Sequence, residues 1–250
     1  MEEKQMSLKT EKLGLMTDEQ ASFVRHQWWE HQHDDMKVDF DISGFGDRIL
    51  REFSIRKGVW DPFKASGGRH ARFLANNTRL FWNKNVLEIG SGTGLLGIVM
   101  ALCGAERVTM SDISEFAVGN TEENVCRFGV ETICDVRKSD LFEQVPEKYD
   151  TILWNIPFFP GNPPEGDTIA ASMIMPPELF SRFLRESQDH LKKGGVVVVP
   201  SYSLGGESMD PLSVGKSLFK GERTWIYESR KGIQQGWLYI TELRIHPSRA

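Results

Sequence analysis

With 250 residues, 40% of them hydrophobic and 26% charged, the chain can bury one full α/β core, which excludes an intrinsically disordered protein and predicts one domain with an extension. A net charge of −5 disfavours a large nucleic-acid interface, because such an interface usually needs a basic face. The longest strongly apolar stretch, around residues 195–200, is far shorter than the roughly 18 residues that a membrane-spanning helix needs, so we expect no membrane partner and a cytoplasmic location.

A helix is predicted near the N-terminus, over residues 18–33. Thr17 and Gln20 have the spacing of a capping box, in which each side chain bonds the backbone N–H of the other residue, and aromatic residues follow at helical spacing. Trp28 and Trp29 are adjacent, so they cannot both face the same way on a helix. We expect one of them to pack on the core and the other to lie over a neighbouring surface or pocket.

The sequence predicts no metal centre. His31, His33, Asp34 and Asp35 are of types that bind metals, but their spacing does not place them on one helical face, which favours a polar helix end. The cysteines show no CxxC spacing, which favours buried, unreactive thiols over a disulfide or a zinc site. These cysteines are Cys103, Cys126 and Cys134.

The remaining residues before the main domain extend this N-terminal region. Alternating residues predict a short strand over 38–42, and Ser43 is a candidate cap for a helix over 46–55. We therefore predict an N-terminal helical extension or cap over 1–57 and a main domain over 58–250.

The most specific pattern in the chain is the run NVLEIGSGTGLLG, which begins at Asn85. Its first residues predict a short buried strand, and Gly90, Gly92 and Gly94 permit a turn whose backbone a ligand can approach closely. A helix is predicted from there to about Cys103, so the turn presents the positive N-terminal end of that helix to the ligand. This unit predicts a site for a nucleotide-like ligand.

The glycines alone do not identify that ligand. Gly92 to Gly97 also fit the GxGxxG pattern, so dinucleotides and S-adenosylmethionine both remain possible. A second strand over 107–112 ends in Asp112, about 20 residues after the glycines, where a carboxylate can accept both hydrogen bonds of a ribose diol. Because both cofactors contain that ribose, later residues must decide between them.

The segments that follow alternate between strands and helices, as in an α/β fold with a parallel sheet. A loop over 157–175, rich in proline and glycine, is expected to form a lid over the site. The run over 196–199 is β-branched throughout, as expected of a central strand that is covered on both faces. The other predicted elements are helices over 68–81, 114–128, 176–191 and 211–219 and strands over 132–136, 149–155, 224–228 and 237–243.

Asn155-Ile-Pro-Phe158 ends the strand over 149–155 and is expected at the carboxyl edge of the sheet, where ligands bind. A planar NH2 group keeps its lone pair in conjugation, and oxygens that accept its hydrogens can turn or polarise it toward a methyl donor. The Asn155 side-chain oxygen and the Ile156 carbonyl can do this, Pro157 fixes the turn, and Phe158 can stack on a flat acceptor. A turn with a structural asparagine and proline is the alternative.

Together, VLEIGSGTG, SDIS, SDLF and WNIPFF resemble the class I S-adenosylmethionine-dependent methyltransferases, over about residues 60–245, and most closely the HemK-like enzymes with an Asn-x-Pro-aromatic motif. The resemblance implies an α/β fold with a seven-stranded Rossmann-like sheet, mostly parallel with an antiparallel last strand and with helices on both faces. It also implies S-adenosyl-L-methionine as the methyl donor, with S-adenosyl-L-homocysteine as the product.

The same resemblance implies roles for individual residues. Trp60 and Phe63 precede the first strand in a segment that lines the acceptor pocket in this family, although both are equally expected as core residues, and Phe159 is a further pocket candidate. The candidate catalytic residues are Asn155, Ile156, Pro157 and Phe158. The candidate cofactor-binding residues are Glu88 at the methionine end, Gly90, Ser91, Gly92, Gly94, Asp112 and Ile113 along the ribose side, Asp140 and Leu141 at the adenine, and Asn155.

We therefore predict an N-methyltransferase that acts on a planar amide or amino nitrogen, with a protein glutamine side chain as the first candidate. HemK-like enzymes usually have proline where Ile156 stands, and the rRNA adenine dimethyltransferases have an aliphatic residue there, but the acidic charge disfavours RNA. Gly58-Val-Trp-Asp61 is similar to protein-lysine methyltransferases, which lack the Asn-x-Pro-aromatic motif. A small-molecule N-methyltransferase and a catalytically silent, cofactor-binding partner subunit are further alternatives.

Overall fold

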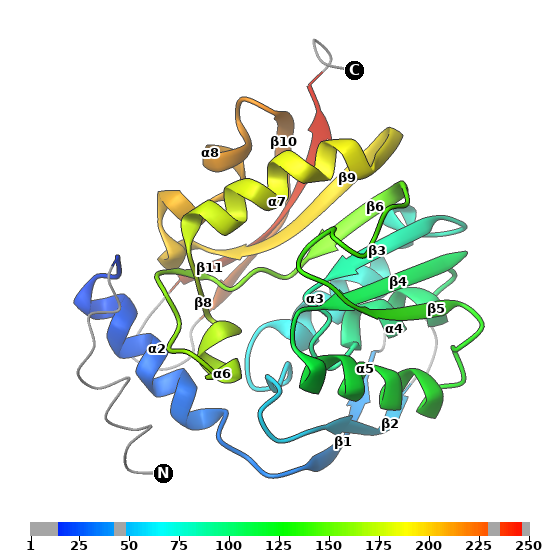
Figure 1. Cartoon of the computed structure of the whole chain (residues 1–250), viewed down its shortest axis with the longest axis horizontal. Helices are drawn as coiled ribbons and strands as arrows, with labels where there is room; N and C mark the ends of the chain where they lie inside the picture. Colours follow the sequence, from blue (N-terminus) through cyan, green and yellow to red (C-terminus); the bar gives the residue numbers. More distant parts are fainter. Residues whose placement is uncertain (1–14, 43–48, 230–235, 247–250) are drawn as a thin grey trace.

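A seven-stranded sheet organises the chain, as Figure 1 shows for the computed structural model, which describes residues 15–42, 49–229 and 236–246. The last strand in the sequence is antiparallel to both of its neighbours, and the other strands run parallel to one another. This arrangement confirms the predicted sheet. In spatial order the strands are β10 (Phe219–Ser229), β11 (Gly236–Ile245), β9 (Leu191–Tyr202), β6 (Tyr149–Trp154), β3 (Asn85–Ile89), β4 (Arg107–Asp112) and β5 (Cys134–Lys138).

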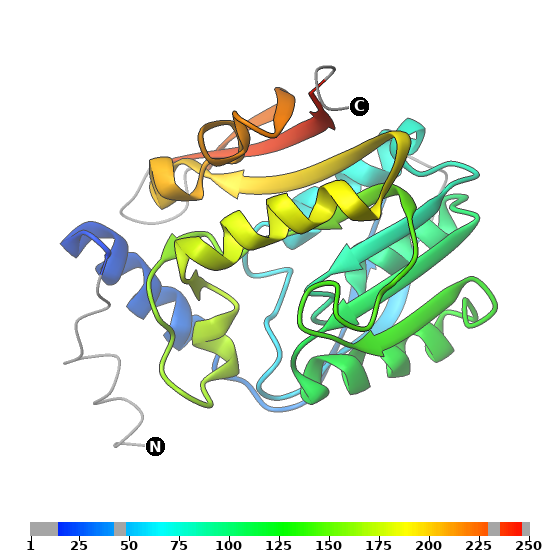
Figure 2. The ribbon, with the colours of Figure 1, turned by 45° about the horizontal axis from the view of Figure 1, so that its top comes forward.

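Helices cover both faces of the sheet, because alternate residues of its strands point to opposite sides (Figures 1 and 2). In β9, Val196 and Val198 belong to one hydrophobic cluster, whereas Val197 and Val199 belong to a second one. The first cluster includes residues of α3 (Gly67–Asn76), α4 (Leu95–Leu102) and α5 (Glu115–Arg127), and the second includes residues of α7 (Pro177–His190) and α8 (Pro211–Gly215).

The predicted N-terminal helix is α2 (Asp18–Glu30), which ends earlier than the predicted residue 33. The capping box is confirmed: the Gln20 N–H donates to the Thr17 hydroxyl at 3.2 Å, and the Thr17 N–H donates to the Gln20 side chain at 2.8 Å. Trp28 is 6% exposed and Trp29 is 49% exposed, which confirms that only one of them packs on the core. Trp28 thereby fixes α2 to the rest of the protein.

The predicted helix over 46–55 is wrong, because residues 49–55 form a strand. β1 (Met36–Asp41) and β2 (Ile49–Ile55) make an antiparallel hairpin, so the predicted strand over 38–42 is confirmed, and Ser43 lies outside the described residues. In β2, Phe53 and Ile55 alternate toward the same hydrophobic cluster as α3 and α4, a spacing that suits a strand. The described part of the N-terminal extension is thus a helix and a hairpin.

The loop over 157–175 has secondary structure of its own and is held against α2. It contains the short parallel strands β7 (Phe159–Pro160) and β8 (Ile174–Met175) and the short helix α6 (Thr168–Ala171). The Trp28 indole N–H donates to Asp167 Oδ2 at 2.8 Å, and the Gln20 amide donates to the Leu204 carbonyl at 2.5 Å. Figure 2 shows α2 and α6 side by side at one end of the sheet.

The other predicted elements are present with shifted ends. The helix over 68–81 is α3 followed by a separate 3-10 turn, and the strand over 196–199 is the centre of the longer β9. Cys103 and Cys134 are buried as predicted, but Cys126 is exposed. Among the described residues, no helix has the length and apolar character that crossing a membrane requires. The 3-10 helices are η1 (Thr78–Leu80), η2 (Ser203–Gly205) and η3 (Glu207–Met209).

Candidate active site

A cavity of about 870 Å³ lies at the carboxyl ends of β3, β4 and β6. Its lining brings together three segments that are distant in the sequence: the glycine turn after β3, the end of β4, and the residues that follow β6. Residues of α2 and of the loop over 157–175 line it as well. The cavity therefore lies where a parallel sheet is expected to bind a ligand.

The glycine turn leaves its backbone open to this cavity. Gly90 and Gly92 have φ of 64° and 57°, in the left-handed region that favours glycine. A Cβ atom on Gly90 would lie 2.8 Å from the indole nitrogen of Trp154, whereas a Cβ on Gly92 would meet nothing within 4 Å. Gly94, with φ of 80°, is the N-cap of α4 and is not among the described residues that line the cavity. A side chain at Gly92 would thus fill space that a ligand can occupy.

Glu88 is a buried carboxyl group on the wall of this cavity. It is 2% exposed, and its Oε2 accepts a hydrogen bond from the Gly97 N–H at 2.8 Å. Burial raises the pKa of Glu88 to about 8, and the Gly97 hydrogen bond offsets only part of that effect. A cationic ligand beside Glu88 would favour its ionised form, so the site suits the ammonium or sulfonium group of a ligand.

Asp112 ends β4 with its carboxylate held by the backbone. Its Oδ2 accepts the Gly92 N–H at 3.0 Å, and its Oδ1 accepts the Ser114 N–H at 2.9 Å. Burial raises the pKa of Asp112, and these hydrogen bonds oppose the shift. Because each carboxylate oxygen can accept a second hydrogen bond, the group can still receive both hydroxyls of a ribose. Ile113 follows it, 66% exposed and on the lining of the cavity.

Asp140 and Leu141 lie on the cavity wall next to β5, where the resemblance implies the adenine. Asp140 Oδ1 is paired with the Arg182 guanidinium on α7, a contact that the sequence did not indicate. Leu141 has φ of 46°, a left-handed conformation that is uncommon for a residue other than glycine. The ion pair orients the Asp140 carboxylate and leaves Oδ2 as the oxygen for a ligand amine.

Asn155, Ile156, Pro157 and Phe158 also line the cavity. Ile156 is buried, whereas Asn155 and Phe158 are half-buried. Within the described chain, Asn155 Oδ1 is buried and has no hydrogen-bond partner, which is unusual for a polar atom. The structure therefore brings the four candidate catalytic residues to the same cavity as the glycine turn, and their roles stay predictions.

The aromatic pocket candidates divide between the cavity and the core. Trp60 lines the cavity, and its ring stacks on the His31 ring at 3.4 Å between centroids. Phe159 also lines it and is almost fully buried. Phe63 is not among the described lining residues, because its ring packs into the hydrophobic core against Phe40, at 4.5 Å between centroids. The expectation that Phe63 is a pocket residue is corrected here.

The lining of the cavity also includes residues that the sequence did not single out as site residues. Phe23 and Gln27 enter from α2 and Tyr202 from the end of β9. The Phe23 ring lies 5.9 Å from the Tyr202 ring. Phe23 and Gln27 follow helical spacing, but only the fold shows that this helix face meets the end of β9.

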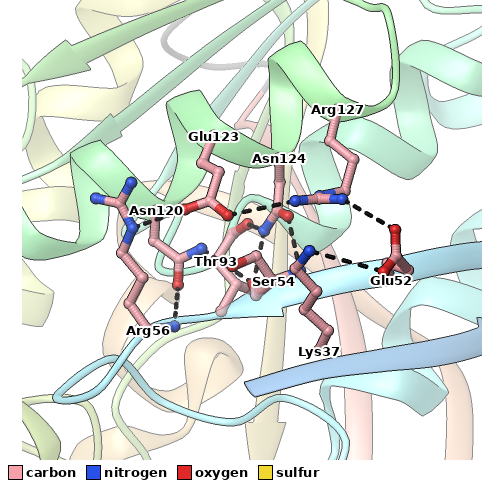
Figure 3. A network of polar contacts seen from close by, with 9 residues as sticks. All are labelled: Lys37, Glu52, Ser54, Arg56, Thr93, Asn120, Glu123, Asn124 and Arg127. Atoms are coloured by element: carbon pink, nitrogen blue, oxygen red, sulfur yellow. Dashed lines mark hydrogen bonds and ion pairs between the residues drawn. The ribbon is translucent and has the colours of Figure 1, made fainter. Parts of the chain in front are cut away.

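A buried network ties the β1–β2 hairpin to the glycine turn through α5 (Figure 3). The Asn124 amide donates to the Ser54 carbonyl at 2.8 Å and to the Thr93 carbonyl at 2.9 Å, and its Oδ1 accepts the Ser54 N–H at 2.9 Å. Asn120 accepts the Arg56 N–H at 2.9 Å and donates to Ser54. These amides thus set the position of the glycine turn from its outer side.

The potential metal ligands after α2 each have another partner. The His31 ring nitrogens face the Gln27 and Asp61 carbonyls, and His33 faces the Val59 carbonyl. Asp34 and Asp35 bind the Lys57 side chain and backbone N–H, respectively. These groups hold the segment before the glycine turn in place.

Several known proteins with similar sequences or structures are methyltransferases by name. Over 130 residues the chain is 39% identical to a protein of Methanocaldococcus jannaschii that is provisionally named a protein N5-glutamine methyltransferase. This alignment covers 50% of this chain and 65% of that protein. Over 101 residues it is 40% identical to the ribosomal protein L11 methyltransferase of Lactobacillus johnsonii, covering 38% and 32%. The chain thus spans less than two thirds of the length of either relative.

A crystal structure supports the fold assignment. The ribosomal protein L11 methylase of Lactobacillus delbrueckii subsp. bulgaricus superposes with a TM-score of 0.54 over 74% of this chain and 83% of that chain, at 21% identity. The family model for the methyltransferase small domain matches residues 69–213, more than half of the sequence. This match includes the glycine turn, Asp112 and the Asn155 motif, and the chain belongs to the methyltransferase small domain family.

Proposed function

We propose that this protein is a cytoplasmic S-adenosylmethionine-dependent N-methyltransferase that acts on a planar amide or amino nitrogen. The observation that supports it best is a single cavity lined both by the glycine turn with Glu88 and Asp112 and by Asn155 through Phe158. A nucleotide-like donor on the first group of residues faces an NH2-bearing acceptor on the second. No element of the second group is needed to bind a dinucleotide.

The residues present fit S-adenosylmethionine. The open space at Gly92 lets the ligand approach the backbone, Asp112 can accept the ribose hydroxyls, and the buried Glu88 carboxyl suits a cationic methionine end. Asp140 Oδ2 can accept an exocyclic amine. When bound, this cofactor supplies an electrophilic methyl group on a positively charged sulfur.

The chain itself contributes alignment and exclusion of water, which are the main needs of an in-line methyl transfer. The Asn155 Oδ1 and the Ile156 carbonyl would accept the two hydrogens of the acceptor NH2 and turn its lone pair toward the methyl carbon. The cofactor would supply the methyl group, whose bond to sulfur would break as its bond to the acceptor nitrogen forms, and the nitrogen would then release one proton to bulk solvent. Phe158 would stack on the flat acceptor.

A protein glutamine side chain is our first candidate for the acceptor. A glutamine amide is planar and carries an NH2 group to which the Asn155 motif can hydrogen-bond. The name of the Methanocaldococcus jannaschii relative points to the same class of acceptor. Ile156, in place of the proline that is usual in HemK-like enzymes, keeps the carbonyl that this role requires.

A small-molecule amine or amide is the second candidate, and one feature of the cavity favours it. Its acceptor side is walled by the aromatic rings of Phe23, Trp60, Phe158 and Tyr202. The Trp28–Asp167 and Gln20–Leu204 hydrogen bonds hold α2 in place along this side. Apolar, aromatic walls with a few polar groups are typical of pockets for small ligands.

The deciding experiment is methyl transfer from tritiated S-adenosylmethionine to a cell extract that is separated afterwards into protein, RNA and small-molecule fractions. Label in protein, recovered as methylglutamine after proteolysis, supports the first candidate, and label in small molecules supports the second. Label in RNA would contradict both acceptor assignments. Calorimetry with S-adenosylhomocysteine and with NAD tests the cofactor separately, and binding of NAD alone would overturn the proposal.

A further inference from the structure

His70 is a buried histidine outside the described lining of the cavity. It lies on α3, is fully buried, and is not among the described residues that line the cavity. Within the described chain, neither of its ring nitrogens makes a hydrogen bond of normal geometry. A buried imidazole without hydrogen bonds is unfavourable, which indicates a hydrogen-bond partner or a functional role among its neighbours.

The polar neighbour of this ring is the side chain of Asn155, which interacts with it and is itself unsatisfied. Asn155 Oδ1 is buried without a hydrogen bond, while the same residue lines the cavity, so the Nδ2 end of the amide is the end left to the cavity. The fully buried His70 ring and the half-buried Asn155 side chain thus meet behind the proposed acceptor site, and neither the ring nitrogens of His70 nor Asn155 Oδ1 make a hydrogen bond of normal geometry within the described chain.

The His70 ring is uncharged in this position. Burial lowers the pKa of His70 to about 3, and the neighbouring Asn155 amide and the Arg69 charge change it less. A neutral imidazole has one nitrogen with a lone pair and can therefore accept a hydrogen bond. On another side, the Trp225 ring meets the His70 ring edge-on at 6.2 Å between centroids.

We propose that His70 is a positioning residue for methyl transfer: its ring accepts a hydrogen bond from Asn155 Nδ2 and thereby directs Asn155 Oδ1 into the cavity, toward the acceptor nitrogen. The two ends of an asparagine amide are nearly identical in shape, so a half-turn of the side-chain amide exchanges them without moving the backbone. This half-turn gives both buried groups a partner and gives the cavity the oxygen that an NH2 acceptor needs.

The reverse orientation of the Asn155 amide would not serve methyl transfer. If His70 donated its N–H to Asn155 Oδ1, the oxygen would be held away from the acceptor and Asn155 would present only N–H donors. The inference rests on the proposed N-methyltransferase function, because that chemistry requires the oxygen on the cavity side.

The test uses the full chain with the substitutions His70→Leu and His70→Gln and, as a matched control, Phe73→Leu. Phe73 lies one turn further along α3 and packs on the same Trp225 ring, at 5.9 Å, so its substitution perturbs the helix packing alone. Glutamine at residue 70 keeps a hydrogen-bond acceptor, and leucine does not. The assay is transfer from tritiated S-adenosylmethionine to the extract fraction that accepts label.

For His70→Leu we expect the initial rate of labelling at saturating S-adenosylmethionine to fall by about tenfold or more, with the Kd of S-adenosylhomocysteine changed by no more than about twofold. His70→Gln should recover most of this rate, and Phe73→Leu should keep it. In an Asn155→Ala background, His70→Leu should have no further effect, because His70 acts through Asn155. An equal loss of rate in Phe73→Leu, or an undiminished effect in the Asn155→Ala background, would overturn the inference.

A second readout does not depend on activity. The side-chain amide resonances of Asn155, identified by their loss in Asn155→Ala, should show a hydrogen-bonded proton that is lost in His70→Leu and kept in Phe73→Leu. Resonances that are the same in wild type and His70→Leu would overturn the hydrogen bond. If wild type labels no fraction, the proposed function fails, while this spectrum still decides the contact between His70 and Asn155.

Discussion

The buried carboxyl of Glu88 makes the stability of the ligand-free protein depend on pH. Its folded pKa is raised from 4.5 to about 8, so between these values the folded state keeps a proton that the unfolded state has lost. The free energy of unfolding then falls as pH rises, by about 1.4 kcal/mol per pH unit. From about pH 6 to about pH 8, this single group lowers the stability by about 2 kcal/mol.

Glu88→Gln isolates this effect, because glutamine keeps an oxygen for the Gly97 N–H and cannot ionise. Urea unfolding, followed by tryptophan fluorescence, should show wild type losing about 2 kcal/mol more than Glu88→Gln between about pH 6 and about pH 8. All other titrating groups are common to the two proteins and cancel in the difference. Parallel pH profiles would refute the raised pKa.

Three further substitutions test the remaining parts of the site. Asp112→Ala should weaken S-adenosylmethionine binding by about 1–3 kcal/mol in calorimetry, through the lost hydrogen bonds to the ribose, and unchanged affinity would contradict that role. Asn155→Ala should leave the Kd of S-adenosylhomocysteine nearly unchanged and lower the methyl-transfer rate by about 10²-fold, and full activity would make the motif structural. Asn124→Ala removes the side-chain partner of the buried Ser54 N–H and of the Thr93 carbonyl, while the Ser54 carbonyl keeps Asn120, so it should lower the free energy of unfolding by about 3 kcal/mol, and a urea midpoint equal to that of wild type would contradict this.

The parts of the fold that the sequence predicted well are those whose signal is local. The strand before Gly90 and the strand that ends at Asp112 each combine an apolar run with a sharp boundary, and both were located to within a residue. The capping box at Thr17 likewise needs only its neighbours. The seven-stranded, mostly parallel sheet with an antiparallel last strand was implied by the family resemblance, because short strands alone do not specify which of them pair.

The sequence-based predictions were wrong where tertiary contacts determine the secondary structure or the buried face of a helix. The spacing of residues 49–55 permits a helix, but their backbone groups pair with β1 and with asparagines about 70 residues later. In α5 the apolar Phe116 is exposed, while Asn120 and Asn124 are fully buried. Asparagine inside a helix face is normally unfavourable, and here it is stabilised by its hydrogen bonds to the Ser54 backbone groups of β2.

The Asp140–Arg182 ion pair and the position of His70 had no signal in the sequence. Arg182 lies far along the chain on α7, and a single histidine within an apolar helix is equally consistent with a core residue. For Phe63, the sequence left core and pocket equally open, and its contact with Phe40 decides for the core.

The asparagine network around Ser54 has a consequence for the order in which the protein is assembled. A ribosome releases β2 well before Asn124, which follows Ser54 by 70 residues, so the hairpin emerges before the amides that satisfy its backbone. The carbonyl of Thr93, on the glycine turn, accepts a hydrogen bond from the same Asn124 side chain. The glycine turn therefore gains this support only after α5, at about the middle of the chain, has been synthesised, so its final conformation depends on the closure of a long-range contact.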